Sequence, residues 1–249
     1  MSPGRRRLER LWGSASASGA RFGAEQLTWQ PADVRRYLEH SIAHGTALAT
    51  AVRLRMHGEI RLGRWRPFTA EQVICSGHGM VWCAGTRVAG VAVGGCDELL
   101  AGEGAMCWRL LGLLPVVRRS GPDITRSAAG RMQAEHVWLP SALCARKVVW
   151  SARPPGRIRA VFPVLGHPGA LELEVGPDGR LKRLQMQRWG APAGSAYAYL
   201  EFGAVAEEER TFSGYTIPSR LRVGWNVGSE RFEHEGEFLR ATVDSAAFR

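Results

Sequence analysis

Apolar and charged side chains alternate along residues 51–63 more regularly than anywhere else in the chain. The apolar positions are Val52, Leu54, Met56, Ile60 and Leu62, and the charged ones are Arg53, Arg55, His57, Glu59 and Arg61. Successive side chains of a β-strand point to opposite faces of its sheet, which gives a period of two residues. The alternation therefore predicts a long strand with one apolar face and one charged face.

A helical period precedes this strand at residues 31–44. The apolar residues of this segment recur every three or four positions, at Val34, Tyr37, Leu38 and Ile42. A proline stands near the start of the segment and a glycine follows its end, as is common at the two ends of a helix. We therefore expect a helix here.

Short segments of β-like sequence follow at intervals of roughly ten to twelve residues, separated by glycine-rich turns such as GTRVAG, VGGCD, AGEG and GPDG. The predicted strands are Glu71–Ile74, Met80–Ala84, Arg87–Val93, Ala105–Leu111, Lys147–Ala152, Arg157–Phe162, Leu171–Val175, Leu181–Arg188, Tyr197–Phe202, Glu207–Phe212, Leu221–Val227 and Phe232–Thr242. This pattern predicts a mainly β (α+β) protein, with one large antiparallel sheet or open barrel and one or two helices.

We expect a single domain over residues 23–249, because no repeat, low-complexity linker or block of charge divides the chain. Residues 1–22 begin with basic residues but lack the apolar stretch of a signal peptide, so we expect a flexible basic tail or a short amphipathic lead-in. The longest apolar runs, around Val88–Val93 and Leu110–Val117, are far shorter than the ~20 residues that span a bilayer. No membrane span is predicted.

The formal net charge is +10, and all but two of the 33 basic residues are arginines. These arginines are scattered along the chain, whereas a nucleic-acid-binding protein usually concentrates its basic residues on one face. We therefore expect a solvated basic surface and no specific nucleic-acid partner. The oligomeric state is left open by the sequence.

The five cysteines include no C-x-x-C pair, so we expect them to be reduced fillers of the core in a cytoplasmic protein. His40 and His44 stand one helical turn apart, but no third ligand lies near them in the sequence, so no metal is expected. Motifs for nucleotide binding, serine hydrolysis and zinc proteolysis are absent, and no cofactor is predicted.

The stretch RSAAGRMQAEHVWLP, residues 126–140, predicts an amphipathic helix that ends at a proline, with Asp123 or Thr125 as its N-cap. Arg131 and Glu135 are spaced to form an i, i+4 pair. If the helix packs onto a sheet, this pair is buried, and Glu135 becomes a candidate acid or base. The alternative is structural: Glu135 ties the helix to an arginine or to the sheet.

Two further residues are candidates for catalysis. Asp97 follows an apolar strand, where an acidic residue could also cap a turn, and Tyr215 flanks the turn TFSGY, where Arg210 also lies. The candidate ligand-binding residues are Arg131, His136, Trp82, Trp108, Trp138 and Trp225. Nine tryptophans in the chain suit a wide, partly wet cavity, because each indole N–H needs a partner, although large rings could equally fill the interior of a curved sheet.

Several longer motifs carry a resemblance to a known family. They are RYLEHSI (36–42), VRLRMHGEIRLGRWRPFTAEQV (52–73), GEGAMCWRLLGLLPV (102–116), GPDITRSAAGRMQAEHVWLP (121–140), QRWG (187–190) and GYTIPSRLRVGW (214–225). In order and spacing, the chain after Phe22 resembles an uncharacterised bacterial family, domain of unknown function 6544. The resemblance implies a fold similar to the lipoprotein-carrier (LolA-like) half-barrel, in which a strongly curved antiparallel sheet wraps around a helix.

The resemblance supplies no activity, but it places Asp97, Arg131, Glu135, Trp138, Tyr215 and Trp225 at positions that match the family pattern. Two stretches depart from that pattern: QRWGAPAG replaces RRWGNPDG, and ELLAGEG replaces an aromatic-rich loop after Asp97. Both departures are expected to alter the rim of any pocket.

Three functional hypotheses follow. The first is a soluble protein that binds a small, largely apolar molecule in a tryptophan-lined concave cavity. The second is an enzyme, such as a cyclase, isomerase or hydrolase, that acts on an apolar metabolite there with Glu135 as acid or base. The third is an interaction module that uses the basic residues Arg5–Arg10.

Overall fold

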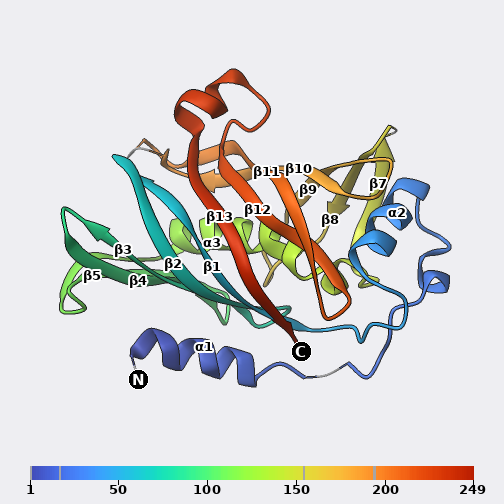
Figure 1. The fold of residues 1–249 in the computed structure, drawn as a ribbon, viewed down its shortest axis with the longest axis horizontal. Coiled ribbons are helices and arrows are strands. Elements are labelled where there is room, and N and C mark those ends of the chain that lie inside the picture. Colours follow the sequence, from blue (N-terminus) through green and yellow to red (C-terminus); the bar gives the residue numbers. More distant parts are fainter. Residues whose placement is uncertain (1, 17, 154, 193–194) are drawn as a thin grey trace.

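A single antiparallel sheet of thirteen strands forms the body of the protein, in the order β6-β5-β4-β3-β2-β1-β13-β12-β11-β10-β9-β8-β7 (Figure 1). The structure is a computed structural model that describes residues 2–16, 18–153, 155–192 and 195–249. The strands are β1 (Ala51–Leu62), β2 (Arg64–Cys75), β3 (Gly79–Val88), β4 (Val91–Leu100), β5 (Glu103–Leu110), β6 (Leu114–Ser120), β7 (Val149–Arg153), β8 (Arg157–Val161), β9 (Ala170–Val175), β10 (Leu181–Gly190), β11 (Ala198–Phe212), β12 (Tyr215–Trp225) and β13 (Glu237–Phe248). The expected mainly β fold with one large antiparallel sheet is confirmed.

The sheet curves around one helix, α3 (Pro122–Glu135), which contacts β4, β5 and β6 on one side and β9 and β10 on the other. In a flat sheet, β5 and β10 would lie about 38 Å apart, at ~4.8 Å per strand. A helix of 14 residues is only about 21 Å long. The two wings of the sheet must therefore bend toward each other across α3, and the sheet remains open at β6 and β7.

The other helices pack elsewhere on the sheet, and the N-terminal helix lies across β2 and β3 on the face opposite α3 (Figure 1). They are α1 (Pro3–Gly13), α2 (Ala32–Ser41), α4 (Pro140–Leu143) and the short 3-10 turns η1 (Ala24–Leu27) and η2 (His136–Trp138), with a π-helical turn η4 (Phe232–Gly236) before β13. The predicted helix in residues 31–44 is thus confirmed as α2, which packs against β7, β8 and β12.

Strand β1 confirms the strand predicted from residues 51–63. Val52, Leu54 and Met56 are buried in the main core, and the charged side chains alternate with them toward the other face. On that other face, Arg53 bonds to Glu9 of α1 and to Glu71 of β2. One face of the strand therefore builds the core, and the other receives a helix.

Some strand boundaries differ from the expectation. Arg87–Val93 is divided by a hairpin turn between β3 and β4, where Ala89 and Gly90 both adopt positive φ. Tyr197–Phe202 and Glu207–Phe212 belong to one long strand, β11, and the expected turn VGGCD lies inside β4. The periodicity located these β segments. Glycine did not by itself distinguish a turn from a strand, because Gly90 lies in a turn whereas Gly94 and Gly95 lie inside β4.

Residues 1–22 also differ from a flexible tail, because half of them, Pro3–Gly13, form α1. Ser2 caps this helix by accepting a hydrogen bond from the backbone of Arg5. Leu8 and Leu11, three positions apart, are buried against β2 and β3 in a second, smaller hydrophobic cluster with Val73. The segment corresponds to the amphipathic lead-in that was the alternative expectation.

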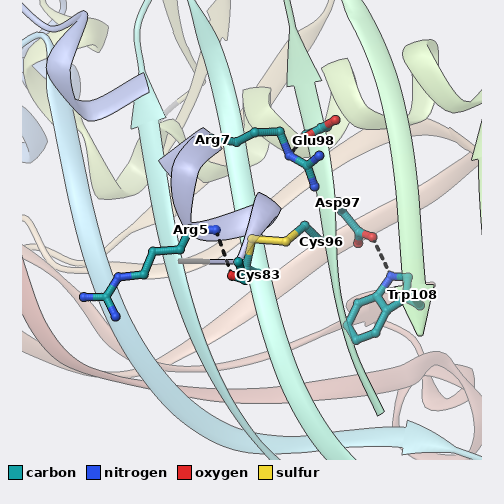
Figure 2. The surroundings of a disulfide bond; sticks show 8 residues. Arg5, Arg7, Cys83, Cys96, Asp97, Glu98 and Trp108 are labelled. Carbon is teal, nitrogen blue, oxygen red and sulfur yellow. Dashed lines mark hydrogen bonds and ion pairs between the residues drawn. A yellow bond between two sulfur atoms is a disulfide. The ribbon is translucent and has the colours of Figure 1, made fainter. Parts of the chain in front are cut away.

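The expectation of five reduced cysteines is wrong for Cys83 and Cys96. These two residues face each other in the β3–β4 register and form a disulfide beneath the first turn of α1 (Figure 2). Cys75, Cys107 and Cys144 are free thiols. The spacing of 13 residues between the bonded cysteines carries no motif, so their pairing depends on the hairpin register that brings them together.

Candidate functional site

Helix α3 begins two to four residues before the N-caps that the sequence predicted. Its N-cap is Gly121, at a φ of 109°, and Pro122 occupies the first helical position. The predicted caps Asp123 and Thr125 are therefore wrong. The Asp123 carboxylate instead accepts a hydrogen bond from the indole of Trp189 at 2.9 Å, and the Thr125 hydroxyl accepts one from the backbone of Gly104 at 2.9 Å.

A largely buried polar cluster fixes the C-terminal half of α3 to the sheet. Arg131 donates from Nε to Glu135 at 2.7 Å and from Nη1 to Asp97 of β4 at 3.1 Å. Glu135 also accepts a hydrogen bond of 2.6 Å from the side-chain amide of Gln72 on β2. We call these four residues the anchor; they join the helix to two strands, and the expected Arg131–Glu135 pair is present within them.

Strand alternation explains why Asp97 reaches the anchor. Its neighbours Cys96 and Glu98 point to the face that carries α1, where Glu98 pairs with Arg7, so Asp97 points to the face that carries α3 (Figure 2). The Trp108 indole donates to Asp97 at 2.8 Å. Burial raises the pKa of the Asp97 carboxyl, and Arg131 and the Trp108 hydrogen bond oppose that rise.

Arg188 of β10 is a second, partly buried cation beside the anchor, and the sequence analysis did not identify it. It donates from Nε and Nη2 to the backbone and hydroxyl of Ser127 on α3, and its guanidinium lies 4.5 Å from the ring centre of Phe202. Burial, together with the nearby charge of Arg131, lowers the pKa of Arg188 to about 10. Arg188 forms no ion pair with any of the described residues, in contrast to Arg131.

The sequence does carry a signal for Arg188. Leu184 and Met186 of β10 are buried core residues, and Arg188 follows them in the same alternating phase. A charged residue in the apolar phase of a strand predicts a buried, functionally or structurally bonded charge. Gln72, which is fully buried, stands in the same relation to Ile74 on β2.

Two cavities meet at Arg131, Arg188 and Asp97. The first, of about 260 Å³, lies between α3 and the strands β10 to β13, and the second, of about 570 Å³, extends from the same residues toward β5 and β6. The apolar residues that line the first cavity are Ile60, Ala134, Val137, Leu184, Phe202, Ala204, Leu221, Val223, Phe238 and Leu239, with Trp82, Trp138 and Trp225. The walls are thus apolar, and the polar groups lie together on one side.

The tryptophans singled out from the sequence differ in their roles. Trp82, Trp138 and Trp225 line the first cavity. Trp82 also lies 4.7 Å from the Arg131 guanidinium, and the Trp138 indole donates to the carbonyl of Pro218 at 3.0 Å. Trp108 lies behind Trp82, with ring centres 5.8 Å apart, and acts on the site through Asp97.

Two predicted site residues lie away from both cavities. Tyr215 begins β12, whose far end carries Trp225 at the cavity, which places the two about 33 Å apart along the strand. The Tyr215 hydroxyl bonds to the carbonyl of Ala47 and the amide of Ala49, and its ring stacks on Phe248. Tyr215 therefore fastens a loop to the sheet and does not meet Asp97 or Glu135.

His136 is buried directly after α3, on the side away from the cavities. Its Nδ1 lies 2.7 Å from the carbonyl of Met132, and its ring packs edge-on against Phe162. Burial lowers the pKa of His136 to about 4. The neutral imidazole thus donates a hydrogen bond that closes the end of the helix, and it does not line the cavity.

The remaining expectations concern metals, membranes and the rim of the pocket. His40 bonds to Glu209 at 2.8 Å rather than to His44, and the described residues contain no group of three or more potential metal ligands. None of the helices in the described part of the chain is long and apolar enough to cross a membrane. Of the expected rim, ELLAGEG runs from β4 into β5, and residues 193–194 of QRWGAPAG lie outside the described residues.

Three solved structures are similar to this chain over most of its length. A putative outer membrane lipoprotein-sorting protein domain from Vibrio parahaemolyticus has a TM-score of 0.42 and 11% identity, covering 80% of this chain and 86% of its own. A DUF1329 family protein from Desulfovibrio piger has a TM-score of 0.44 and 11% identity, with the same coverage. A LolA superfamily protein from Nitrosomonas europaea has a TM-score of 0.42 and 10% identity, covering 87% and 92%.

No curated protein matches the sequence. A family model does match, over residues 30–248, and its description is "Family of unknown function (DUF6920)". The family number 6544 suggested by the resemblance is not the one that matches, whereas the expectation of an uncharacterised family is confirmed. Because the match covers far more than half of the chain, this protein belongs to the family of unknown function DUF6920.

Proposed function

We propose that the protein binds a small, largely apolar molecule in the cavity between α3 and strands β10 to β13. The observation that carries this proposal is the lining: aliphatic and aromatic side chains enclose about 260 Å³, and the polar groups are confined to one side. Concave apolar pockets with a few convergent polar groups are the usual form of small-molecule sites.

The polar side of the cavity favours a ligand with one acidic or hydrogen-bond-accepting group. Arg131 is bonded to the carboxylates of both Asp97 and Glu135, so its own positive charge already has anionic partners within the anchor. Arg188 bonds only to Ser127 among the described residues, through Nε and Nη2, and it is one of the residues that line the cavity. A carboxylate or similar group would complete the hydrogen bonds of this guanidinium.

The cavity volume sets the size of the ligand. A volume of about 260 Å³ lies just below the range of about 300–1,000 Å³ that is usual for small-molecule sites, so a small ligand is expected. A longer molecule would extend into the second cavity, which shares Arg131 and Arg188 with the first. A medium-chain carboxylic acid has a suitable size and polarity.

Isothermal titration calorimetry with decanoate and with 1-decanol tests the proposal, since both have the same tail and differ in the head group. We expect decanoate to bind more tightly, and Arg188→Met to remove that preference. Val223→Trp fills the cavity from its partly exposed wall and is expected to weaken both ligands at least tenfold. The same replacement on the exposed surface of β7, Val149→Trp, is the matched control and leaves both affinities unchanged.

Equal binding of both ligands by wild type and Val223→Trp would contradict the proposal, as would the absence of any binding. Native mass spectrometry of the freshly purified protein, followed by extraction under denaturing conditions, identifies a molecule that is already bound. The alternative of an enzyme with Glu135 as acid or base remains a prediction, and Glu135→Gln addresses it below.

A further inference from the structure

The hairpin between β5 and β6 exposes an unusual amount of apolar surface. Leu111, Leu113, Leu114 and Val116 are 62%, 79%, 64% and 53% exposed, and they lie within six consecutive positions. Single exposed apolar residues are common in soluble proteins, whereas a contiguous group usually marks a contact surface. This is the densest such group in the described part of the chain.

Three neighbouring hairpin turns lie at the same end of the sheet. The strands β1 to β6 are consecutive and antiparallel, so the turns at Gly63, Ala89–Gly90 and Leu111–Leu113 all lie at one end of the strands. Leu111 also donates its backbone N–H to Ala92 at 2.8 Å, which joins the second turn to the third. We call these three turns and the ends of their strands the hairpin rim.

The hairpin rim is basic and contains no acidic residue. Its three segments, 60–68, 85–93 and 108–119, include seven arginines and neither Asp nor Glu. Arg109, Arg118 and Arg119 flank the exposed leucines, are themselves exposed, and form no ion pair with other described residues. An apolar tip surrounded by unpaired cations is complementary to a surface that is apolar inside and anionic outside.

The edge strand itself argues against pairing with a second copy of the chain. β6 ends the sheet, but Pro115 lacks a backbone N–H and Arg118 and Arg119 place like charges along the strand. Proline and charged residues on an edge strand prevent strand addition. A second copy would also bring the same basic rim toward itself.

We propose that the hairpin rim docks on a lipid bilayer that carries anionic headgroups, with the leucines of the β5–β6 hairpin inserted and the arginines at the headgroups. This surface lies outside the ligand cavity, so the inference goes beyond the proposed function. The two are nevertheless adjacent, because Val117 and Arg119 of β6 line the larger cavity. Docking would place the mouth of that cavity at the lipid surface.

Vesicle flotation with the full chain tests the proposal, using phosphatidylcholine vesicles with and without about a third phosphatidylglycerol. We expect wild type to bind only the anionic vesicles, and to be released as the salt concentration rises. Leu113→Ser/Leu114→Ser is expected to weaken binding by about tenfold or more per leucine, because insertion of each side chain is lost. Arg118→Gln/Arg119→Gln is expected to weaken it about fivefold per arginine.

Val149→Ser/Val161→Ser is the matched control. These two valines are exposed register partners on β7 and β8, at the opposite edge of the sheet, so the change in apolar surface is similar. All the substituted side chains are exposed, so the variants should retain the wild-type melting temperature, which circular dichroism checks.

Three outcomes would overturn the proposal. Wild type that fails to float with anionic vesicles has no such docking surface. Equal loss of binding in the hairpin and control variants would assign the effect to general surface polarity. A wild-type dimer in solution that Leu113→Ser/Leu114→Ser converts to a monomer would show that a second copy covers the rim. Decanoate titration of the same variants is independent of all three results.

Discussion

Arg188 and Arg131 are two partly buried arginines in one site with opposite bonding. Arg131 is held by two carboxylates, whereas Arg188 is held by a hydroxyl, a carbonyl and aromatic faces. A guanidinium in apolar surroundings without a carboxylate partner is costly to bury. This difference explains why Arg131 is assigned to the helix attachment and Arg188 to ligand recognition.

His136 predicts a pH dependence of stability at the residue scale. Burial lowers its folded-state pKa from 6.5 to about 4, so the unfolded chain takes up the proton first as the pH falls. The free energy of unfolding that depends on the neutral His136 is therefore fully present above about pH 6.5. It decreases by up to roughly 3 kcal/mol as the pH falls from there to about 4. Urea unfolding of wild type and His136→Gln across this range measures the difference, and the variant should show the shallower decline.

His44→Gln is the control, because His44 is exposed at the end of the α2 segment. Its unfolding free energy should follow the wild-type pH profile. A His136→Gln profile parallel to wild type would mean that His136 is protonated without cost in the folded protein, contrary to its burial.

Local spacing in the sequence was sufficient for the Arg131–Glu135 pair, and strand position for Asp97. It was not sufficient to exclude Tyr215 and His136, since each is a polar residue near an aromatic or apolar segment whose hydrogen-bond partner is a backbone carbonyl. For His136 that carbonyl belongs to Met132, one helical turn earlier. For Tyr215 that partner is Ala47, 168 positions away. No periodicity records such a contact, because only the completed sheet brings the two segments together.

At the scale of elements, α3 is attached to the sheet by side-chain hydrogen bonds and ion pairs as well as by apolar packing. The anchor fixes it to β2 and β4, and Ser127 fixes it to β10 through Arg188. These bonds cross the concave face in both directions. The helix therefore sets the separation of the two wings and, with it, the width of the cavities.

Glu135→Gln tests this attachment. Replacing the carboxylate by an amide leaves one acceptor oxygen for two donors, Arg131 Nε and the Gln72 amide, and removes the negative charge beside Arg131, so it is expected to lower the free energy of unfolding by about 1–3 kcal/mol. We expect decanoate affinity to change little, since Arg188 is untouched. Urea denaturation and calorimetry measure the two quantities.

Glu172→Gln is the matched control, because Glu172 forms an exposed ion pair with Arg159 at 3.8 Å. Such surface pairs contribute little, so its unfolding free energy should change by less than about 1 kcal/mol. An unchanged stability for Glu135→Gln, together with loss of a chemical turnover on an apolar substrate, would instead support the enzyme alternative.

The elements with clean periodicity were predictable, and those that depend on tertiary contact were not. β1 and α2 follow from apolar spacing alone, whereas β6 was missed because its leucines and valines are exposed. Apolar residues in an edge hairpin break the rule that links hydrophobicity to burial. Helix α1 was underestimated for a related reason: only Leu8 and Leu11 mark its buried face.

At the scale of the whole molecule, the disulfide is a side-chain cross-link between two strands: it joins β3 to β4 in the wing that carries Asp97 and the hairpin rim. Closing a loop of this length stabilises a protein by about 3 kcal/mol in the chain-entropy model. The expected cytoplasmic location remains a prediction; a disulfide is more usual in an oxidising compartment.

Reduction is therefore expected to lower the free energy of unfolding by up to about 3 kcal/mol, measured by urea unfolding with and without dithiothreitol. Thiol titration of the denatured, unreduced protein should find the three free cysteines, Cys75, Cys107 and Cys144. Five reactive thiols and a stability insensitive to reductant would contradict the Cys83–Cys96 bond in solution. Cys83→Ser/Cys96→Ser should match the reduced wild type.

The place of β13 in the sheet has a consequence for how the protein is made. β13 is the last strand of the chain, yet it lies at the centre of the strand order, between β1 and β12. β13 leaves the ribosome after the other twelve strands, so until it emerges both wings present long unpaired strand edges to the cell. The sheet can be completed only once β13 is available, and a nascent chain of this protein should depend on chaperones more than its size suggests.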